Sequence, residues 1–480
     1  MKRQCVVIGG GIAGMSAALL LASQGMSVTL AEKAPRLAPL VRGFTRCGVH
    51  FDTGFHNTGY LEPGEILDRA FALMGVSGVE SFVLGRDGDQ RVAVTGGPDA
   101  GYPLPSGFTL VRETLGECFS KEREGLAKYL EAVRAAQESS PYLFAGGTLA
   151  AEPYPNATLA QVLDELFYDV RLKSVLASQI LYHGVRPDEA SFVFHARVGA
   201  APLRSLRAVA GGGEALVSAF ERALAKAGVE IVTGRAVEAV TVSAPGGEVS
   251  GVRLEGGEPL AARRVVATVH PALLARWVPD GVFRPVYVKR LTQRPESPRA
   301  AMVFGLLPPG TVVLPGQSQF FLNGHDPGRW LGETPENGPG GPDDLDALSV
   351  MIGPSKGADG RIGFELAACE SGSSSKEEMR ERLTRHFTRV MPGLASQAVF
   401  LDAAVSSTFA RFANSPYGSF YGPRHVAGCH GLQSRTKLAG LHLAGQAVVA
   451  PGIAGAVISA CVCADALLGS AAIRKGLASC

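Results

Sequence analysis

The chain opens with the feature that most constrains its fold: a short β-branched run, three spaced glycines and an apolar helical stretch in immediate succession. Residues 5–8 predict a strand, and a helix is expected over 15–24. Between them Gly9, Gly11 and Gly14 satisfy the pattern Gly-x-Gly-x-x-Gly, which carries weight only at such a strand-to-helix junction. This order predicts an α/β protein with a Rossmann-type nucleotide-binding unit at its start.

The glycines and the start of the helix together suit a dinucleotide. The first glycine allows a tight turn, the second lets the backbone approach a pyrophosphate, and the third permits close packing of helix on strand. The helix start offers unpaired N–H groups and the positive end of the helix dipole. A second strand over 27–31 ends at Glu32, whose carboxylate is placed to bind both adenosine ribose hydroxyls and to repel a 2′-phosphate. The segment therefore predicts FAD or NAD rather than NADP.

Beyond Glu32 the patterns predict further helices and then a return of the chain to the first sheet. Long helical patterns follow over 65–74, 121–137 and 159–182. A Gly-rich turn then opens a unit with a helix and strands over 215–227, 230–233, 236–242 and 264–269. The last segment predicts a strand, a turn and an apolar helix over 441–446, 450–455 and 456–468. We therefore expect both ends of the chain to meet at one ligand.

Three shorter segments complete the outline. Paired glycines at 246–247 and 256–257 mark the turns of a hairpin. Residues 334–346 lack periodicity and predict a surface loop, whereas 376–391 has apolar residues at helical spacing opposite a charged face. The latter is typical of a helix that covers a sheet.

Composition excludes several classes of function. With 46 Lys and Arg against 44 Asp and Glu, the net charge of +2 lacks the basic excess of nucleic-acid-binding proteins. The eight cysteines form no disulfide framework and no Cys-x-x-Cys pair, and no metal-ligand pattern occurs, so a reducing cytoplasm and no metal site are expected. No stretch approaches the ~18 apolar residues of a membrane span. A basic segment interleaved with apolar residues, 284–299, fits either a solvated edge or peripheral contact with anionic lipid on the inner face of the membrane.

Further motifs follow the glycines and Glu32 in a fixed order: Phe51-Asp52-x-Gly54, Gly211-Gly212-Gly213-Glu214, Ser415-Pro416-Tyr417-Gly418 and Gly445-Gln446 through Pro451-Gly452-Ile453. This series resembles the FAD-dependent amine oxidase and phytoene desaturase superfamily, and most closely its branch of carotenoid desaturases, carotenoid isomerases and retinol-saturase-like proteins. The resemblance spans essentially the whole chain. It implies a glutathione-reductase-like, Rossmann-type FAD domain built from 1–75, 205–272 and 405–480, with an α+β substrate lobe inserted as 76–204 and 273–404.

The resemblance also implies FAD as the cofactor and assigns its contacts. The adenosine ribose would lie on Glu32, the pyrophosphate over 9–14, and the flavin under 445–455, with the N–H near Ile453 facing the flavin pyrimidine carbonyl. The cofactor-binding residues implied are Gly9, Gly11, Ile12, Ala13, Gly14, Glu32, Lys33, Arg42, Val237, Gly445, Gln446, Gly452 and Ile453.

The sequence departs from the superfamily at two positions near the flavin. Members usually follow the ribose acid with a Gly-Gly-Arg-like turn, whereas residues 34–42 here read Ala-Pro-Arg-Leu-Ala-Pro-Leu-Val-Arg. Arg36 or Arg42 is expected to take over the role of that arginine. Gln446 stands where many flavoproteins have Asp, and its amide can still hydrogen-bond a ribitol hydroxyl.

Five side chains are candidates for a catalytic role. By resemblance His56, Tyr417 and Tyr421 would lie near the flavin, while Tyr182 and His183 end the helix predicted over 159–182 and would face a substrate cavity. The alternative for each is a hydrogen-bonded structural residue, which a lone His or Tyr more often is.

The leading hypothesis is an FAD-dependent oxidoreductase that acts on C–C bonds of an apolar polyene or isoprenoid, by desaturation, saturation or isomerisation. The cofactor carries the redox step, and the protein supplies a dry slot and a proton donor. One alternative is a flavin amine oxidase that oxidises a C–N bond, with Tyr417 and Tyr421 in an aromatic cage. A second is a non-enzymatic lipid-binding protein of the GDP-dissociation-inhibitor lineage. Substrate, electron acceptor and oligomeric state stay open.

Overall fold

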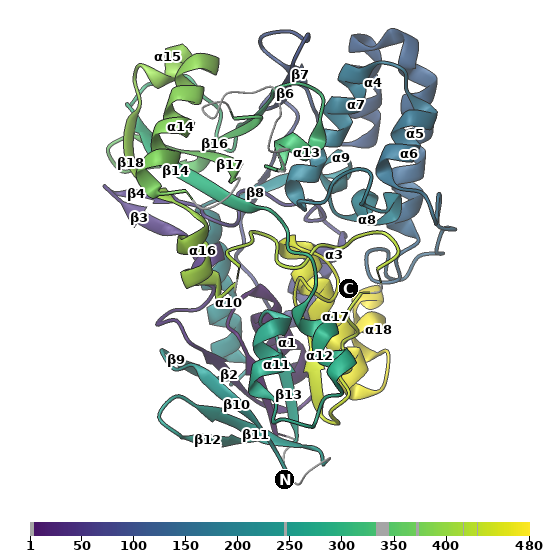
Figure 1. Cartoon of the computed structure of the whole chain (residues 1–480), viewed down its shortest axis with the longest axis vertical. Coiled ribbons are helices and arrows are strands. Elements are labelled where there is room, and N and C mark those ends of the chain that lie inside the picture. The colour runs from purple at the N-terminus through teal and green to yellow at the C-terminus, as the bar shows by residue number, and fades with distance from the viewer. Residues whose placement is uncertain (1–3, 244–246, 333–344, 371–373, 416, 430) are drawn as a thin grey trace.

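A parallel sheet assembled from three distant parts of the chain forms the base of the molecule, in the lower half of Figure 1. The computed structural model describes residues 4–243, 247–332, 345–370, 374–415, 417–429 and 431–480. The sheet has the order β19-β13-β1-β2-β9, and every neighbouring pair is parallel. Its strands are β1 (Gln4–Ile8), β2 (Ser27–Glu32), β9 (Glu230–Thr233), β13 (Arg264–Ala267) and β19 (Leu441–Leu443). This confirms the predicted α/β, Rossmann-type fold.

Helices from both ends of the chain pack together against this sheet. Helix α1 (Ile12–Ser23) contacts α17 (Gly452–Leu468), and the apolar side chains of α1 are almost all buried. Since a helix that is apolar all round must be covered on every side, α1 lies inside the lobe rather than on its surface. Helices α10 (Gly212–Lys226), α3 (Ile66–Met74) and α18 (Ala472–Ser479) complete this core. The two chain ends therefore share one hydrophobic core.

A small antiparallel sheet adjoins the parallel one. It consists of β10 (Val237–Val242), β11 (Val249–Leu254) and β12 (Pro259–Ala261). Helices α11 (Pro271–Trp277) and α12 (Pro285–Thr292) follow β13 in the chain. They pack against each other, and α11 also contacts β10. The glycine pair 256–257 lies between β11 and β12 as predicted, whereas the turn at 246–247 falls partly outside the described residues.

The second lobe, in the upper half of Figure 1, combines a mixed sheet with a helical bundle. The sheet has the order β18-β14-β17-β16-β15-β6-β7. Its strands are β6 (Gln90–Val94), β7 (Tyr102–Pro103), β14 (Arg299–Leu307), β15 (Ser318–Leu322), β16 (Ala347–Lys356), β17 (Ile362–Glu370) and β18 (Val399–Ala404). Helix α14 (Lys376–Val390) packs on this sheet through Met379, Leu383 and Phe387, which is the covering role predicted for 376–391.

The helical part of the second lobe, at the upper right of Figure 1, packs around a separate core. Its helices are α4 (Phe108–Cys118), α5 (Arg123–Glu138), α6 (Leu159–Leu166), α7 (Val170–Ala177), α8 (Phe192–Arg197) and α9 (Ala201–Arg204). Short 3₁₀ turns precede α5 and follow α7. Two small ribbons, β3 (Phe44–Arg46) with β4 (Val49–Phe51) and β5 (Ser81–Val83) with β8 (Arg207–Val209), complete the described strands.

The single helix predicted over 159–182 is wrong, because the chain breaks between α6 and α7. Phe167 adopts an extended conformation, and Asp169 caps α7 by accepting a hydrogen bond from the Arg171 N–H. The buried carboxylate of Glu122 accepts the N–H groups of Tyr168 and Asp169. This long-range contact satisfies the backbone groups that the break exposes.

Two helices begin earlier than predicted, since glycines expected in turns form their first turns. Helix α17 begins at Gly452 rather than 456, and α10 begins at Gly212 rather than 215. Strand β19 ends at Leu443, three residues before the predicted end. Most of the predicted loop 334–346 lies outside the described residues. No helix in the described part of the chain is both long and apolar enough to cross a membrane.

Candidate active site

A cavity runs along the carboxyl edge of the parallel sheet, where ligands bind in open α/β sheets. It is lined by Glu32 at the end of β2, by Gly9 and Gly11 after β1, and by Gly445 after β19. We call it the cofactor cavity. Of the cofactor-binding residues named from the sequence, eleven line it: Gly9, Gly11, Ile12, Ala13, Glu32, Lys33, Val237, Gly445, Gln446, Gly452 and Ile453.

The glycine turn leaves room for a ligand on one side and none on the other. A Cβ on Gly14 would lie 1.8 Å from the Gly9 carbonyl oxygen, and Gly9 has φ +102°, so neither position accepts a side chain. A Cβ on Gly11 would meet no protein atom within 4 Å, although Gly11 lines the cavity. The space above Gly11 therefore fits a group that approaches the backbone, as a pyrophosphate does.

Glu32 is held in place by the turn that it faces. One carboxylate oxygen accepts the Gly10 N–H at 2.6 Å and the other accepts the Ala34 N–H at 2.8 Å. The residue is 9% exposed. Since each carboxylate oxygen can accept two hydrogen bonds, both oxygens retain capacity for the hydroxyls of a ribose. The residues present thus fit the adenosine end of FAD.

The other end of the cofactor cavity is formed by the start of α17. This helix has no side-chain cap and no acidic residue in its first turn, while Gly452, Ile453 and Ala456 line the cavity. Its free N–H groups and dipole favour negative charge at this position. These properties fit the pyrimidine end of a reduced flavin, which was the expectation for Ile453.

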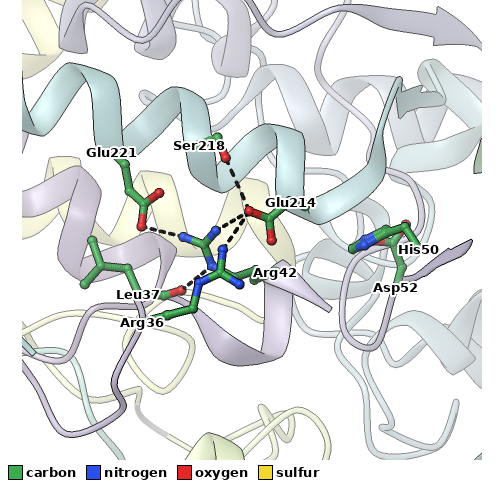
Figure 2. A network of polar contacts seen from close by, with 8 residues as sticks. All are labelled: Arg36, Leu37, Arg42, His50, Asp52, Glu214, Ser218 and Glu221. Atoms are coloured by element: carbon green, nitrogen blue, oxygen red, sulfur yellow. Dashed lines mark hydrogen bonds and ion pairs between the residues drawn. The ribbon is translucent and has the colours of Figure 1, made fainter. Parts of the chain in front are cut away.

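Arg42 does not reach the cofactor cavity, contrary to the sequence interpretation. Its side chain is 3% exposed and forms ion pairs with Glu214 and Glu221 of α10, while its Nε donates to the Leu37 carbonyl (Figure 2). Arg36 also binds Glu214. Two carboxylates from one helix therefore hold both arginines. A buried guanidinium such as that of Arg42 is costly unless it is paired with an opposite charge, and these carboxylates provide the pairing.

Apolar residues line the cavity where the superfamily arginine was expected. The lining residues of this turn are Ala38, Pro39, Leu40 and Val41. Ala38 has φ +48°, a left-handed conformation in which glycine is usual. The turn thus keeps the backbone shape of a glycine turn but places no cation on the cavity wall.

The catalytic candidates separate into two groups. Tyr421 lines the cofactor cavity, and its hydroxyl donates to the Leu181 carbonyl at 2.7 Å. Tyr182 lines a second cavity, described below, and burial raises its pKa to about 12. His56, His183 and Tyr417 line neither cavity.

His183 is a buried structural residue rather than a cavity-facing one. Its Nδ1 accepts the Val185 N–H, so its Nε2 carries the proton and donates to Nδ1 of His195 at 3.0 Å. Burial lowers the pKa of His183 well below its ordinary value, and the neighbouring His195 adds to that effect. Burial also lowers the pKa of His56, with the nearby Asp52 acting in the opposite direction. Tyr417 is 45% exposed.

One hydrogen-bonded group in the cavity wall escaped sequence analysis. His270 caps α11 by accepting the Ala272 N–H, and its other nitrogen donates to Glu296 at 3.0 Å. Ser419 donates to the same carboxylate and is linked to Ser415. His270, Ser415 and Ser419 line the cofactor cavity. The available signal was the position of His270 just after β13, at the carboxyl edge of the sheet.

A second cavity adjoins the first and shares Gly452 and Ile453 with it. We call it the side cavity. Most of its wall is apolar or carries hydroxyl groups, and it is formed by α8, α9, the segment 57–60 and the first turn of α17. Its charged lining residues within the described chain are Arg197 and Glu152. Because the two cavities meet at one helical turn, a ligand in the side cavity would lie next to the flavin end of the cofactor cavity.

Comparison with known proteins supports the resemblance read from the motifs. Residues 12–468 match the profile of the family described as flavin containing amine oxidoreductase. The chain is 25% identical over 279 residues to all-trans-retinol 13,14-reductase of Homo sapiens, covering 54% of this chain and 45% of that protein. It is 28% identical over 283 residues to hydroxyneurosporene desaturase of Rubrivivax gelatinosus, covering 54% and 52%. The matches thus span about half the length of these relatives.

The fold agrees with solved structures over nearly the whole chain. A crystal structure of an oxidoreductase from Methanosarcina mazei superimposes with a TM-score of 0.66 at 15% identity, covering 95% of this chain and 98% of that one. At this identity the likeness concerns the fold alone. The family match and the two relatives, in contrast, confirm the predicted resemblance to the carotenoid desaturase and retinol saturase branch, and the family match confirms the prediction of FAD as cofactor.

Proposed function

Because this chain belongs to the flavin-containing amine oxidoreductase family, we propose that it is an FAD-dependent oxidoreductase acting on C–C bonds of an apolar polyene or isoprenoid. The observation that carries the proposal is the apolar wall formed by Ala38, Pro39, Leu40 and Val41 in the cofactor cavity. An uncharged carbon skeleton needs such a surface, whereas an ammonium substrate gains nothing from it. The names of the relatives, a retinol reductase and a carotenoid desaturase, support the same substrate class.

Bound FAD supplies the two-electron redox chemistry. Glu32 would hold the ribose, the turn of Gly9 and Gly11 the pyrophosphate, and the start of α17 the flavin pyrimidine. Val237, Lys33, Gly445 and Gln446 line the remainder of the cofactor site. The chain's own part in the reaction is to orient the two ligands and exclude water around the apolar carbon skeleton that reacts.

Tyr182 is our proposed proton donor or acceptor, since its side chain lines the side cavity beside the shared turn of α17. The phenol carries its proton at neutral pH, and burial raises its pKa from the ordinary value of 10 to about 12, which makes it a weaker acid than an exposed tyrosine. The FAD-loaded Tyr182→Phe variant should keep its flavin spectrum and lose turnover. Undiminished turnover would exclude Tyr182 and leave Tyr421 as the next candidate.

The amine oxidase alternative has less support from the cavity. An aromatic cage would need both Tyr417 and Tyr421, but Tyr417 does not line the cofactor cavity and the Tyr421 hydroxyl is bound to Leu181. The lipid-chaperone alternative conflicts with a complete cofactor cavity. Purified protein that is colourless and resists reconstitution with flavin would favour that alternative.

Anaerobic incubation with a panel of polyenes and amines tests the proposal, with flavin bleaching and product mass followed together. Loss of two hydrogens from a polyene identifies a desaturase, gain of two a saturase, and unchanged mass with altered retention an isomerase. Bleaching by amines alone would overturn the proposal in favour of the amine oxidase.

We further propose that the protein works in a reducing compartment such as the cytoplasm, at the inner face of a membrane. The eight cysteines, all within the described part of the chain, form no disulfide, and α12 within the basic segment 284–299 exposes 74% of Val286. Flotation with anionic liposomes tests the contact. Binding that falls as salt rises supports it, and absence from the liposome fraction at low salt contradicts it.

A further inference from the structure

The side cavity contains a cation that the protein holds rigidly. Arg197 ends α8, and its Nε donates to the Ala136 carbonyl at 2.9 Å while its Nη2 donates to Ser139 at 2.8 Å. Tyr60 donates to the Arg197 carbonyl at 2.9 Å. Since Ala136 and Ser139 lie at the end of α5, the negative end of that helix dipole also favours the guanidinium. The cation is therefore fixed at the cavity wall before any ligand arrives.

The partner of this cation within the cavity is easily displaced. Nη2 of Arg197 also donates to Glu152 at 2.7 Å, but the Glu152 side chain is 47% exposed, against 27% for Arg197. Exposed ion pairs of this kind contribute little to stability. Glu152 lies on the segment between α5 and α6, outside any helix or strand. Its carboxylate can return to water at little cost, whereas Arg197 cannot turn away from the cavity.

The remainder of the side cavity is complementary to a neutral, largely apolar chain. Val193, Phe194, Val198 and Ile458 contribute apolar surface, and Arg197 with Glu152 supplies the charge among the described lining residues. Nη1 of Arg197 has no hydrogen-bond partner in the described part of the chain, so it can bind a second ligand oxygen. Once Glu152 leaves Nη2, one N–H of Nη2 and the N–H groups of Nη1 can together bind a carboxylate through two parallel hydrogen bonds.

We propose that the side cavity binds an apolar polyene or isoprenoid chain that ends in a carboxylate, and that this carboxylate displaces Glu152 from Arg197. The inference rests on the proposed function and narrows its substrate class. The anionic end would lie on Arg197, and the chain would extend towards Gly452 and Ile453, where the two cavities meet. Arg197 is thus a specificity-determining residue rather than a catalytic one.

Binding of all-trans-retinoic acid and of its methyl ester to the FAD-loaded protein tests the proposal at pH 7.5. The acid should bind at least about ten-fold more tightly than the ester, in line with a charge-assisted hydrogen bond. Arg197→Gln should remove this preference and leave ester binding unchanged. Glu152→Gln should tighten acid binding several-fold, because it removes the competing carboxylate. Lys128→Gln, which removes one positive charge from the exposed face of α5, should change neither.

Equal affinity of the unmodified protein for acid and ester would overturn the proposal, as would an Arg197→Gln variant that loses both ligands equally. If Arg197→Gln fails to fold, the test rests on Glu152→Gln. Acid binding that is unchanged in the Glu152→Gln variant would refute the proposal that the ligand carboxylate displaces Glu152 from Arg197. Flavin bleaching by neutral polyenes, without any preference for the acid, would refute this inference and leave the proposed function standing. Acid binding that depends on Arg197, without flavin bleaching by any polyene, would support the carboxylate site and refute the redox function.

Discussion

Replacing Arg42 by Gln separates a structural role of this arginine from a cofactor-binding one. The resemblance placed Arg36 or Arg42 beside the flavin, whereas the structure pairs Arg42 with Glu214 and Glu221 (Figure 2). The change removes a buried charge and leaves the two carboxylates of α10 without it. If the role of Arg42 is structural, its replacement should lower the stability of the FAD-free protein, because the contacts of Arg42 exist before the cofactor binds.

The size of this effect follows from the exposure of the three partners. Breaking a buried ion pair costs about 3–5 kcal/mol when the remaining charge stays buried. Glu214 and Glu221 are each 38% exposed, so water can partly replace the arginine, and Arg36 still reaches Glu214. We therefore expect Arg42→Gln to lower the free energy of unfolding by about 2–3 kcal/mol, somewhat below that range because the carboxylates are not fully buried. Arg36→Gln is the matched control, since Arg36 is 62% exposed and should cost less than about 1 kcal/mol.

Urea unfolding of the FAD-free variants measures these differences, with circular dichroism and tryptophan fluorescence compared to test for a single transition. FAD affinity is measured in parallel from flavin fluorescence. Arg42→Gln should weaken FAD binding only several-fold, through the neighbouring turn of 38–41. The reasoning is refuted if Arg42→Gln leaves the free energy of unfolding within about 0.5 kcal/mol while it weakens FAD binding strongly. That result would support a role of Arg42 in binding the flavin.

Three further predictions concern buried positions. Burial, and to a smaller extent the nearby Asp52, raises the pKa of Glu365 well above its ordinary value of 4.5. The free energy of unfolding should therefore fall as pH rises above about 4.5, by at most about 1.4 kcal/mol per pH unit, and Glu365→Gln should flatten that decline. Urea unfolding curves of the variant and the unmodified protein that shift equally with pH would contradict this. Gly14→Ala should destabilise the FAD-free protein, because its Cβ would lie 1.8 Å from the Gly9 carbonyl oxygen, whereas Gly11→Ala should fold normally and weaken FAD binding. Equal changes in the melting temperature of the two FAD-free variants would contradict these different roles of the two glycines. Ala38→Gly should leave the free energy of unfolding unchanged or raise it by up to about 1 kcal/mol, since φ there is +48°, and a loss of about 1 kcal/mol would show that this backbone is unstrained.

The cofactor end of the fold could be predicted from the sequence because its signals are local. Gly9, Gly11, Gly14 and Glu32 lie within one strand–helix–strand unit, so each constraint acts between near neighbours in the chain. The apolar pattern of 456–468 likewise predicted a helix on its own. In these segments the turn chemistry and the hydrophobic period point to one structure.

The remaining features depend on contacts that sequence spacing does not reveal. Arg42 binds a carboxylate 172 residues away, and the break before α7 depends on Glu122, 46 residues from Tyr168. The pairing of His270 with Glu296 and the exclusion of His183 from the side cavity also arise from packing between segments. Residue type and position made Arg42 and His183 candidates and left His270 unnoticed, and only the tertiary structure decided which of the three faces a cavity.

The first turn of α17 explains how one site can serve two ligands. Gly452 and Ile453 belong to the walls of both the cofactor cavity and the side cavity. Gly452 has φ +83°, and a Cβ there would meet no protein atom within 4 Å, so no side chain fills the space beside this turn. Transfer between two bound molecules requires their reacting atoms to approach to about 3–3.5 Å. A helix start without a side chain that borders both cavities would permit that approach in the proposed reaction, so the glycine at this position would matter for the proposed chemistry as well as for the fold.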